Sequence, residues 1–123
     1  PTTTISPPTD DSQLVKDHPD ENFGSATYLD IYDYTYVVRR SCVKFDLSSI
    51  PSSATINLAK LRLYYYGYDT NKANPSGRQV DVHRFLGDWD ESTITWNNAP
   101  DYASTPTDSI IKPRSLDRME CHE

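Results

Sequence analysis

Short runs of alternating apolar and polar residues recur along the chain, and turn-forming clusters such as KDHPDENFGS and DTNKANPSGR separate them. A period of two is typical of a β-strand with one buried and one solvent-facing side. We predict strands at residues 13–15, 28–32, 37–47, 59–66 and 80–85, with 89–100 as a loop or a short strand. No segment has the pattern of a helix of any length. Short strands at regular spacing with polar turns indicate an all-β sandwich or barrel.

The alternation also assigns the side chains to two sides of the predicted strands. The expected interior side carries Val43, Phe45, Leu47, Leu61, Leu63, Tyr65, Val80 and Val82. The expected opposite side carries Cys42, Lys44, Asp46, Arg62, Tyr64, Tyr66, Asp81 and His83. If the three strands that hold them are neighbours, the charged and aromatic members of the second set share one outer surface.

An outer surface of this kind suits a glycan, including an acidic one. Aromatic rings stack on the C–H faces of sugars, while Arg, Lys and Asp form hydrogen bonds with hydroxyls or carboxylates. The candidate ligand-binding residues are Lys44, Arg62, Tyr64, Tyr66 and His83. The alternative is a solvent face whose tyrosines stabilise cross-strand pairs.

Composition limits the size of the core and the classes of partner. Hydrophobic residues make up 36% of the 123 residues, but nine Tyr, three Phe and two Trp indicate a folded domain with a modest core. The formal net charge is −6, which argues against nucleic acid and against an anionic membrane surface as partners. No apolar run is long enough for a membrane span, so membrane insertion is not expected.

A structural calcium ion is a further candidate, because calcium prefers carboxylate and carbonyl oxygens. Asp10 and Asp11 are the candidate metal ligands, with Asp17, Asp20 and Glu21 in the following loop able to converge on the same sheet edge. The sequence has no EF-hand spacing. The alternative is a set of solvated loop acids.

Nothing in the sequence has the pattern of a catalytic centre. There is no nucleophile elbow, phosphate loop or HExxH motif. Asp88, Asp90 and Glu91 could be proposed as paired carboxylates, but DWDEST is more typical of a turn whose carboxylates cap backbone amides. Cys42 and Cys121 are expected to be free thiols, with a disulfide as the alternative.

The two ends of the chain differ from its middle. Residues 1–9, PTTTISPPT, are expected to be a Pro/Thr-rich linker to a neighbouring domain, and residues 10–123 one β-sandwich module. Because the chain starts with Pro1, we expect a mature product or an excised module.

Four strings along residues 10 to 110 resemble one family: NFG, KFDLSSIP, AKLRLY and WDESTITWNNAP. Together they are similar to the DNRLRE-type domain, found in archaeal disaggregatase-related surface proteins and in carbohydrate-binding modules attached to alginate lyases. The resemblance implies a jelly-roll-like antiparallel β-sandwich, an extracellular or cell-surface setting and polysaccharide binding. It implies no shared catalytic residues.

The chain departs from that family pattern in two places. Relatives continue for some 40 residues, through a W-x-x-[WF]-D-V-T strand, whereas this chain ends RMECHE, with Arg118 and Cys121 at the expected aromatic positions. We therefore expect a sandwich that lacks its last strands, with an open sheet edge that allows self-association. Cys42 also occupies a position that is often aromatic in relatives.

Three functions follow, and the first is favoured. It is a non-catalytic carbohydrate-binding module of a secreted or cell-surface protein, in which Tyr64→Ala costs about 1 to 3 kcal/mol of binding. The second is a structural or adhesion spacer of the cell envelope without glycan affinity. The third, an enzyme acting alone, has the least support. A flanking lyase or hydrolase domain in the parent protein would favour the first, and serial copies would favour the second.

Overall fold

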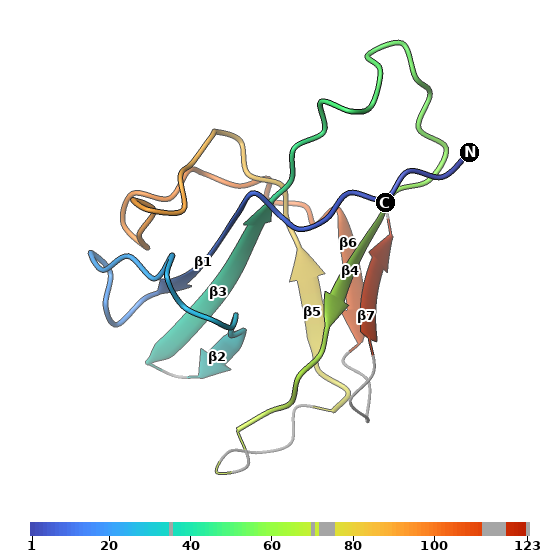
Figure 1. Ribbon diagram of the computed structural model, residues 1–123. Coiled ribbons are helices and arrows are strands. Elements are labelled where there is room, and N and C mark those ends of the chain that lie inside the picture. The colour runs from blue at the N-terminus through green and yellow to red at the C-terminus, as the bar shows by residue number, and fades with distance from the viewer. Residues whose placement is uncertain (35, 70, 72–75, 112–117, 123) are drawn as a thin grey trace. The chain divides into compact units, whose positions relative to one another are not determined.

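The computed structural model describes residues 1–34, 36–69, 71, 76–111 and 118–122 (Figure 1). These residues form strands β1 (Asp10–Val15), β2 (Tyr32–Tyr34), β3 (Val37–Lys44), β4 (Lys60–Tyr64), β5 (Gln79–Val82), β6 (Asp108–Ile111) and β7 (Arg118–His122). The part of the chain that the structure describes holds no helix, and so none with the length and apolarity to cross a membrane. All strand pairs are antiparallel. The predicted all-β antiparallel class is confirmed, and it is consistent with a β-sandwich.

The chain divides into two compact units. Unit 1 comprises residues 1–54 and 87–101, and unit 2 comprises residues 55–86 and 102–123. Each unit is therefore built from two stretches of chain that are separated in the sequence. All of the buried side chains among the described residues belong to unit 1.

Unit 1 is built on a three-stranded sheet with β3 between β1 and β2 (Figure 1). The register of β1 with β3 runs from Asp10 opposite Lys44 to Val15 opposite Arg39. Side chains of β1 alternate between two faces, yet four consecutive residues, 12–15, are buried. Both faces of the sheet are therefore covered along β1.

One face of this sheet is covered by residues 87–101. The Arg40 guanidinium lies 4.8 Å from the ring centroid of Trp96, and the Lys44 ammonium 5.2 Å from that of Trp89. Cys42 lies between these two cations on the same face of β3, and its side chain is buried. Ile94, in the middle of the covering segment, is only 2% exposed. The indole rings and Ile94 thus shield this side of the small core.

The other face is covered by residues 16–31. Gln13 Nε2 donates a hydrogen bond to the backbone oxygen of Tyr28 over 2.7 Å, and Ser41 Oγ donates to the backbone oxygen of Asp30 over 2.6 Å. Gln13 and Ser41 are opposite each other in the β1–β3 register, so they lie on one face. Side chains of the sheet therefore bind the backbone of the covering loop.

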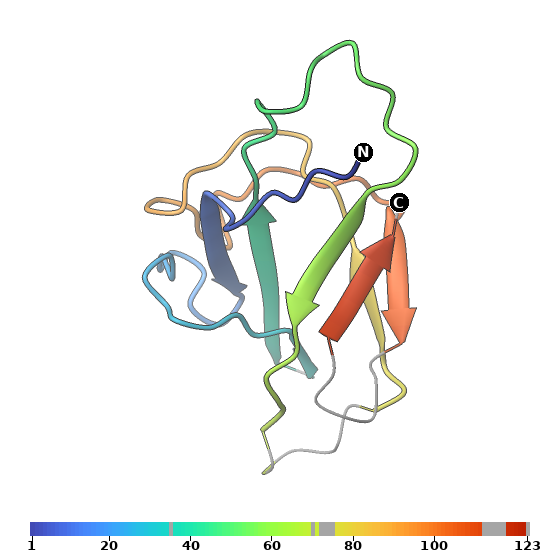
Figure 2. The same ribbon diagram turned by 45° about the vertical axis from the view of Figure 1, so that its right-hand side comes forward.

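Unit 2 contains two antiparallel ladders, β4 with β7 and β5 with β6 (Figure 2). β6 also lies in contact with β7. In β4, half-buried Leu61 and Leu63 alternate with exposed residues, and in β5 half-buried Val80 and Val82 do the same. The predicted inward and outward sides of both strands are confirmed.

Several predictions of strand position were wrong. Residues 28–31 are irregular, and the backbone oxygens of Tyr28 and Asp30 accept hydrogen bonds from the side chains of Gln13 and Ser41. β6 and β7 were not predicted. The strands β3, β4 and β5 do not pair with one another but with β1 and β2, with β7 and with β6. Alternation shows which way a side chain points, but it does not identify the partner strand.

The predicted sides of β3 were also wrong. Cys42 is a buried core residue with a free thiol, whereas Leu47, predicted to be interior, is 60% exposed beyond the end of the strand. Burial raises the pKa of the Cys42 thiol to about 12, so the thiol stays protonated at neutral pH. The side chain of Cys121 lies outside the described residues.

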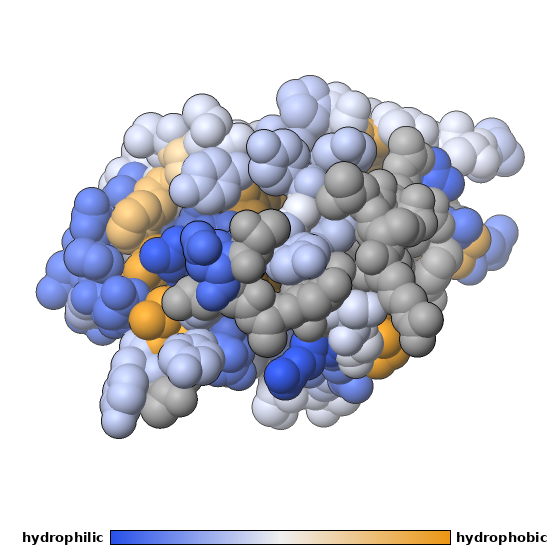
Figure 3. All heavy atoms as spheres, turned by 90° about the horizontal axis from the view of Figure 1, so that it is seen from below, coloured by the Kyte–Doolittle hydropathy of each residue, from blue (hydrophilic) through white to orange (hydrophobic). Residues whose placement is uncertain are grey.

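The surface in Figure 3 is mainly hydrophilic, with apolar residues in small separate groups.

Candidate functional site

Three of the five predicted ligand-binding residues form one exposed row in unit 2. Arg62 and Tyr64 are on β4, and Tyr66 continues the alternation two positions beyond Tyr64. The side chains of Tyr64 and Tyr66 are 78% and 85% exposed. We call Arg62, Tyr64 and Tyr66 the β4 row. It presents two phenol rings and a guanidinium along one side of an extended backbone.

The exposure of the β4 row follows from the period of the strand. Leu61, Leu63 and Tyr65 take the half-buried side, which sends Arg62, Tyr64 and Tyr66 to the solvent side. An exposed tyrosine contributes little to the core of the protein. Tyrosines are enriched in contact surfaces, because one ring offers both an apolar face and a polar hydroxyl. Residues two apart on a strand are separated by roughly 6.6 Å. The two rings can therefore meet successive units of one extended ligand.

His83 belongs to the same unit but has a different environment. Its Nδ1 lies 2.7 Å from the backbone oxygen of Ala103, and its ring meets the ring of Tyr102 edge to face with centroids 5.1 Å apart. The side chain is half-buried. The imidazole therefore has protein partners on its ring edge and one nitrogen, and its role as a ligand contact stays a prediction.

Lys44 lies in unit 1 and is held by a group of acidic and carbonyl oxygens. Its Nζ is 3.1 Å from Asp88 Oδ1 and 3.7 Å from Asp10 Oδ1, and it donates a hydrogen bond to the backbone oxygen of Trp89. The hydrogen bond with Asp88 is the main cause that raises the pKa of the Lys44 ammonium. Lys44 thus ties β3 to the segment that covers it. A role in ligand contact remains untested.

The candidate metal ligands Asp10 and Asp11 make separate contacts at the start of β1. Asp10 Oδ2 accepts a hydrogen bond from the Glu91 backbone amide over 3.0 Å, and that bond is the main cause that lowers the pKa of Asp10. The backbone amide of Asp11 donates to Glu91 Oε1 over 3.2 Å. Consecutive strand residues point to opposite faces. Across the described ranges, no group of three or more His, Cys, Asp or Glu residues is arranged to hold a metal ion; calcium binding stays a prediction.

The acidic string DWDEST forms the predicted turn. Asp90 Oδ1 accepts a hydrogen bond from the Ser92 backbone amide over 2.8 Å, so the carboxylate caps the turn as expected. Hydrogen bonds from Ser92 lower the pKa of Asp90, and the hydrogen bond from Lys44 lowers that of Asp88. A general acid for glycoside cleavage needs a raised pKa. These two carboxyl groups have the opposite shift.

The strings that carry the family resemblance meet each other in unit 1. Asn22 Nδ2 donates hydrogen bonds to the backbone oxygens of Glu91 and Ile94, each over 2.8 Å, and Asn22 Oδ1 accepts from the Gly24 amide over 3.1 Å. A Cβ atom at Gly24 would lie 2.0 Å from the Glu91 backbone oxygen. Only glycine allows this approach. NFG and WDESTITWNNAP are therefore two halves of one structural clamp.

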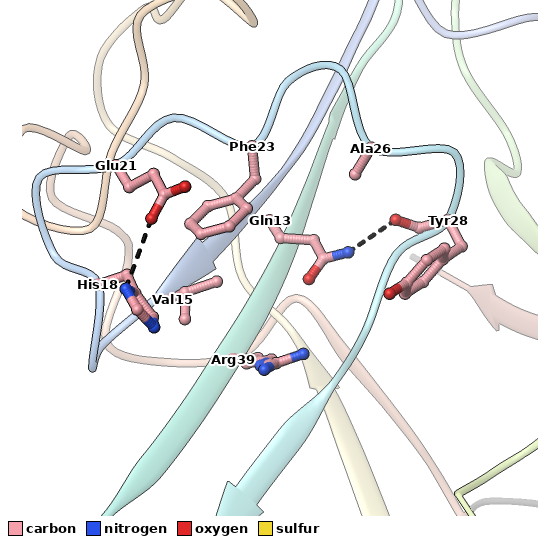
Figure 4. Close-up of a pocket in the computed structure, with 8 residues that line it drawn as sticks. All are labelled: Gln13, Val15, His18, Glu21, Phe23, Ala26, Tyr28 and Arg39. Atoms are coloured by element: carbon pink, nitrogen blue, oxygen red, sulfur yellow. Dashed lines mark hydrogen bonds and ion pairs between the residues drawn. The ribbon is translucent and has the colours of Figure 1, made fainter.

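The sequence did not reveal a pocket of about 350 Å³ in unit 1. Its walls come from β1, β3 and the loop between β1 and β2 (Figure 4). The lining residues are Gln13, Val15, His18, Glu21, Phe23, Ala26, Tyr28 and Arg39. The β1–β3 register brings Arg39 opposite Val15, although 24 positions of sequence (39 − 15) separate them. No spacing along the chain signals such a group.

Comparison with known proteins gives one family. Residues 2–115 match the family model described as carbohydrate-binding module family 96. The match covers most of the chain, including both stretches of unit 1 and the β4 row. Among curated proteins, no sequence matches the chain.

Proposed function

Since the chain belongs to carbohydrate-binding module family 96, we propose that it is a non-catalytic module that binds polysaccharide through the β4 row. The observation that carries the proposal is the exposure of Tyr64 and Tyr66 on one side of a strand, next to a cation. Stacked rings bind the apolar C–H faces of sugars, and the guanidinium donates to hydroxyl or carboxylate oxygens. This combination suits an extended polysaccharide lying along β4.

The setting is part of the same proposal. The resemblance of NFG, KFDLSSIP and WDESTITWNNAP to the DNRLRE-type domain supports a secreted or cell-surface protein in which the module lies beside other domains. In that setting the module would hold its parent protein on a polysaccharide outside the cell. The parent sequence tests this: an export signal and a flanking lyase or hydrolase domain are expected.

The binding proposal is tested by affinity gel electrophoresis in gels that contain single polysaccharides, both acidic and neutral. We expect retardation by at least one polymer. Tyr64→Ala and Tyr66→Ala should each weaken that binding by about 1 to 3 kcal/mol, or roughly 5- to 150-fold, which is the size of an aromatic stacking contribution.

The chain offers a matched control for this test. Tyr36 is 84% exposed, like Tyr66 at 85%, but it lies in unit 1 outside the β4 row. Tyr36→Ala should leave the affinity unchanged. Equal losses in all three variants would reject the β4 row as the site. The absence of retardation on every polymer would instead favour the structural spacer.

The non-catalytic part of the proposal has its own measurement. Incubation of the protein with alginate and with chondroitin-like polymers should yield no new reducing ends and no unsaturated uronate absorbance. Turnover that disappears in Asp88→Asn, Asp90→Asn or Glu91→Gln would overturn it, since these are the carboxylates that sequence alone offered for catalysis.

A further inference from the structure

We propose that the pocket in unit 1 is a second binding site, which takes a single uncharged sugar residue independently of the β4 row. The proposal rests on the proposed function only for the class of ligand, a carbohydrate. The pocket itself is a feature of one unit, with walls from β1, β3 and residues 16–31. Its volume of about 350 Å³ is at the lower end of the range of small-molecule sites, which is suitable for a single sugar residue.

The lining of the pocket combines apolar and hydrogen-bonding groups. Val15, Phe23, Ala26 and Tyr28 provide apolar surface, and Figure 4 shows the Phe23 ring directed toward the middle of the group. Gln13 also projects inward, and its amide is oriented because Nε2 donates to the Tyr28 backbone oxygen. A sugar ring has the complementary surface, with C–H faces and hydroxyl edges.

Arg39 gives this wall an unusual donor. Its Nη1 is bound to Asp30 Oδ2 over 2.9 Å, but its Nε is buried and has no hydrogen-bond partner in the structure. Buried donors are almost always paired, and an unpaired one calls for a specific explanation. The Nε atom itself is closed off from solvent, so a ligand hydroxyl would reach the accessible part of the Arg39 side chain, which is 35% exposed.

The charges around the pocket select against an anionic ligand. Asp30 already neutralises Arg39, and Glu21 lies on the opposite side next to His18, with Glu21 Oε2 3.4 Å from His18 Nδ1. Asp17 Oδ2 is a further 3.8 Å neighbour of His18. Among the residues that line the pocket, Arg39 is paired with Asp30 and His18 lies next to two carboxylates, so binding of a uronate would be unfavourable. Hydroxyl groups can use both the carboxylates and the guanidinium.

The pocket is formed before any ligand arrives. The loop that closes it is fixed by Asn22 and Gly24 against residues 91–94 and by Asp30 against Arg39 and Ser41. A rigid site avoids the entropic cost of ordering a loop on binding. Even so, a ligand of about a dozen heavy atoms reaches only roughly millimolar affinity. Enclosure on several sides also favours the end of a chain, or a free monosaccharide, over the middle of a polymer.

The test is a two-dimensional ¹H–¹⁵N NMR titration of the full chain with neutral monosaccharides and, separately, with glucuronate. At least one neutral sugar should shift the Gln13 side-chain amide and the amides of residues 18–28, with saturation at millimolar concentration. Tyr28→Ala should weaken this binding at least 5-fold, because the ring lines the pocket while only the backbone of Tyr28 holds Gln13. The matched control is Tyr34→Ala, since Tyr34 is 63% exposed compared with 61% for Tyr28 and lies outside the pocket.

The outcomes separate this inference from the proposed function. Neutral-sugar binding that survives Tyr64→Ala but not Tyr28→Ala supports an independent pocket, even if polysaccharide gels show no retardation. Shifts with glucuronate and not with neutral sugars would overturn the ligand class. Retardation that depends on Tyr64, without any sugar-induced shift at the pocket, would overturn the pocket and leave the β4 row in place.

Discussion

The two units of this protein use the same strand geometry for opposite purposes. In unit 1, side chains bind the backbone of distant segments: Asn22 reaches Glu91 and Ile94, and Gln13 reaches Tyr28. In unit 2, the side chains of β4 divide into a half-buried row and an exposed row. Unit 1 therefore uses its most distinctive residues for folding, whereas the most accessible aromatic residues of unit 2 are available for contact.

This difference changes how the family strings should be interpreted. NFG and WDESTITWNNAP make the match to a carbohydrate-binding family easy to notice, but the structure assigns Asn22, Gly24 and Asp90 to clamps and turns. Lys44, in KFDLSSIP, ties β3 to Asp88 and Trp89. Only AKLRLY, through Arg62 and Tyr64, contributes to the β4 row. The strings that carry a family resemblance can therefore include residues that hold the fold together.

The largest effect is expected from a methyl group placed in the clamp. In Gly24→Ala the Cβ atom would lie 2.0 Å from the Glu91 backbone oxygen, so the two segments must separate. Overpacking of this kind costs 1–3 kcal/mol and more where backbone must move, so we expect a loss of about 3 kcal/mol in the free energy of unfolding. Urea unfolding followed by tryptophan fluorescence measures it, because both tryptophans are in unit 1.

The matched control for that change is in unit 2. Gly77 has φ of +82°, but a Cβ atom at this position would have nothing within 4 Å. Gly77→Ala should therefore cost only the strain of a left-handed backbone, about 1 to 2 kcal/mol. If Gly77→Ala destabilises the protein as much as Gly24→Ala does, close approach is not what distinguishes unit 1.

The next largest effect is expected from removing the side-chain amide of Asn22, which joins its loop to residues 91–94. Asn22→Ala removes two donated bonds and leaves the Glu91 and Ile94 carbonyls without that partner, so we expect a loss of about 2 kcal/mol in the free energy of unfolding. Asn22→Asp keeps the size and the acceptor for Gly24 but cannot donate, so it should be at least as harmful. Asn97→Ala, which removes an exposed bond to Asp20, should change stability by less than about 0.5 kcal/mol. A harmless Asn22→Asp would show that the two carbonyls need no donor.

The sequence could predict what depends on local alternation. The exposed and half-buried sides of β4 and β5 follow from Leu61, Leu63, Val80 and Val82, because side-chain direction needs only the backbone period. β6 escaped prediction because its four residues carry only two apolar side chains, and its strand character comes from pairing with β5. The hydrogen bonds from Gln13 and Ser41 to the backbone of residues 28–31 come from other parts of the chain, so no local pattern reveals them.

The same limit applies to the candidate sites. The β4 row was predictable, since its three residues are two positions apart on one strand. The pocket was not, because Gln13, Phe23 and Arg39 meet only through the β1–β3 register and the clamp on the loop. Lys44 was predicted as a ligand contact from its side of β3, but its partners Asp88 and Trp89 lie more than 40 positions away. Long-range partners decide whether a polar side chain holds the fold or faces a ligand.

The smallest effect is a difference between the units in acid. Asp10 in unit 1 and Asp81 in unit 2 both have a lowered pKa, Asp10 mainly through the Glu91 amide and Asp81 mainly through the Gln79 side chain.

A carboxyl group whose pKa is lower in the folded than in the unfolded state stabilises the protein at pH values above the unfolded pKa, here 3.8. That contribution disappears as the pH falls through the folded pKa. Asp10 connects β1 to Glu91, 81 positions away, and to Lys44. Among the described residues, the hydrogen bonds of Asp81 are those with its strand neighbours Gln79 and Ser109, and His83 adds a coulombic contribution. Asp10→Asn should therefore lower the stability at pH 7 and flatten the decline in stability as the pH falls below the unfolded value of 3.8, with the variant and the parent protein converging at the acid end. Asp81→Asn should flatten it less. Thermal unfolding at a series of pH values measures both, and an equal or larger flattening in Asp81→Asn would contradict the view that long-range polar contacts are concentrated in unit 1.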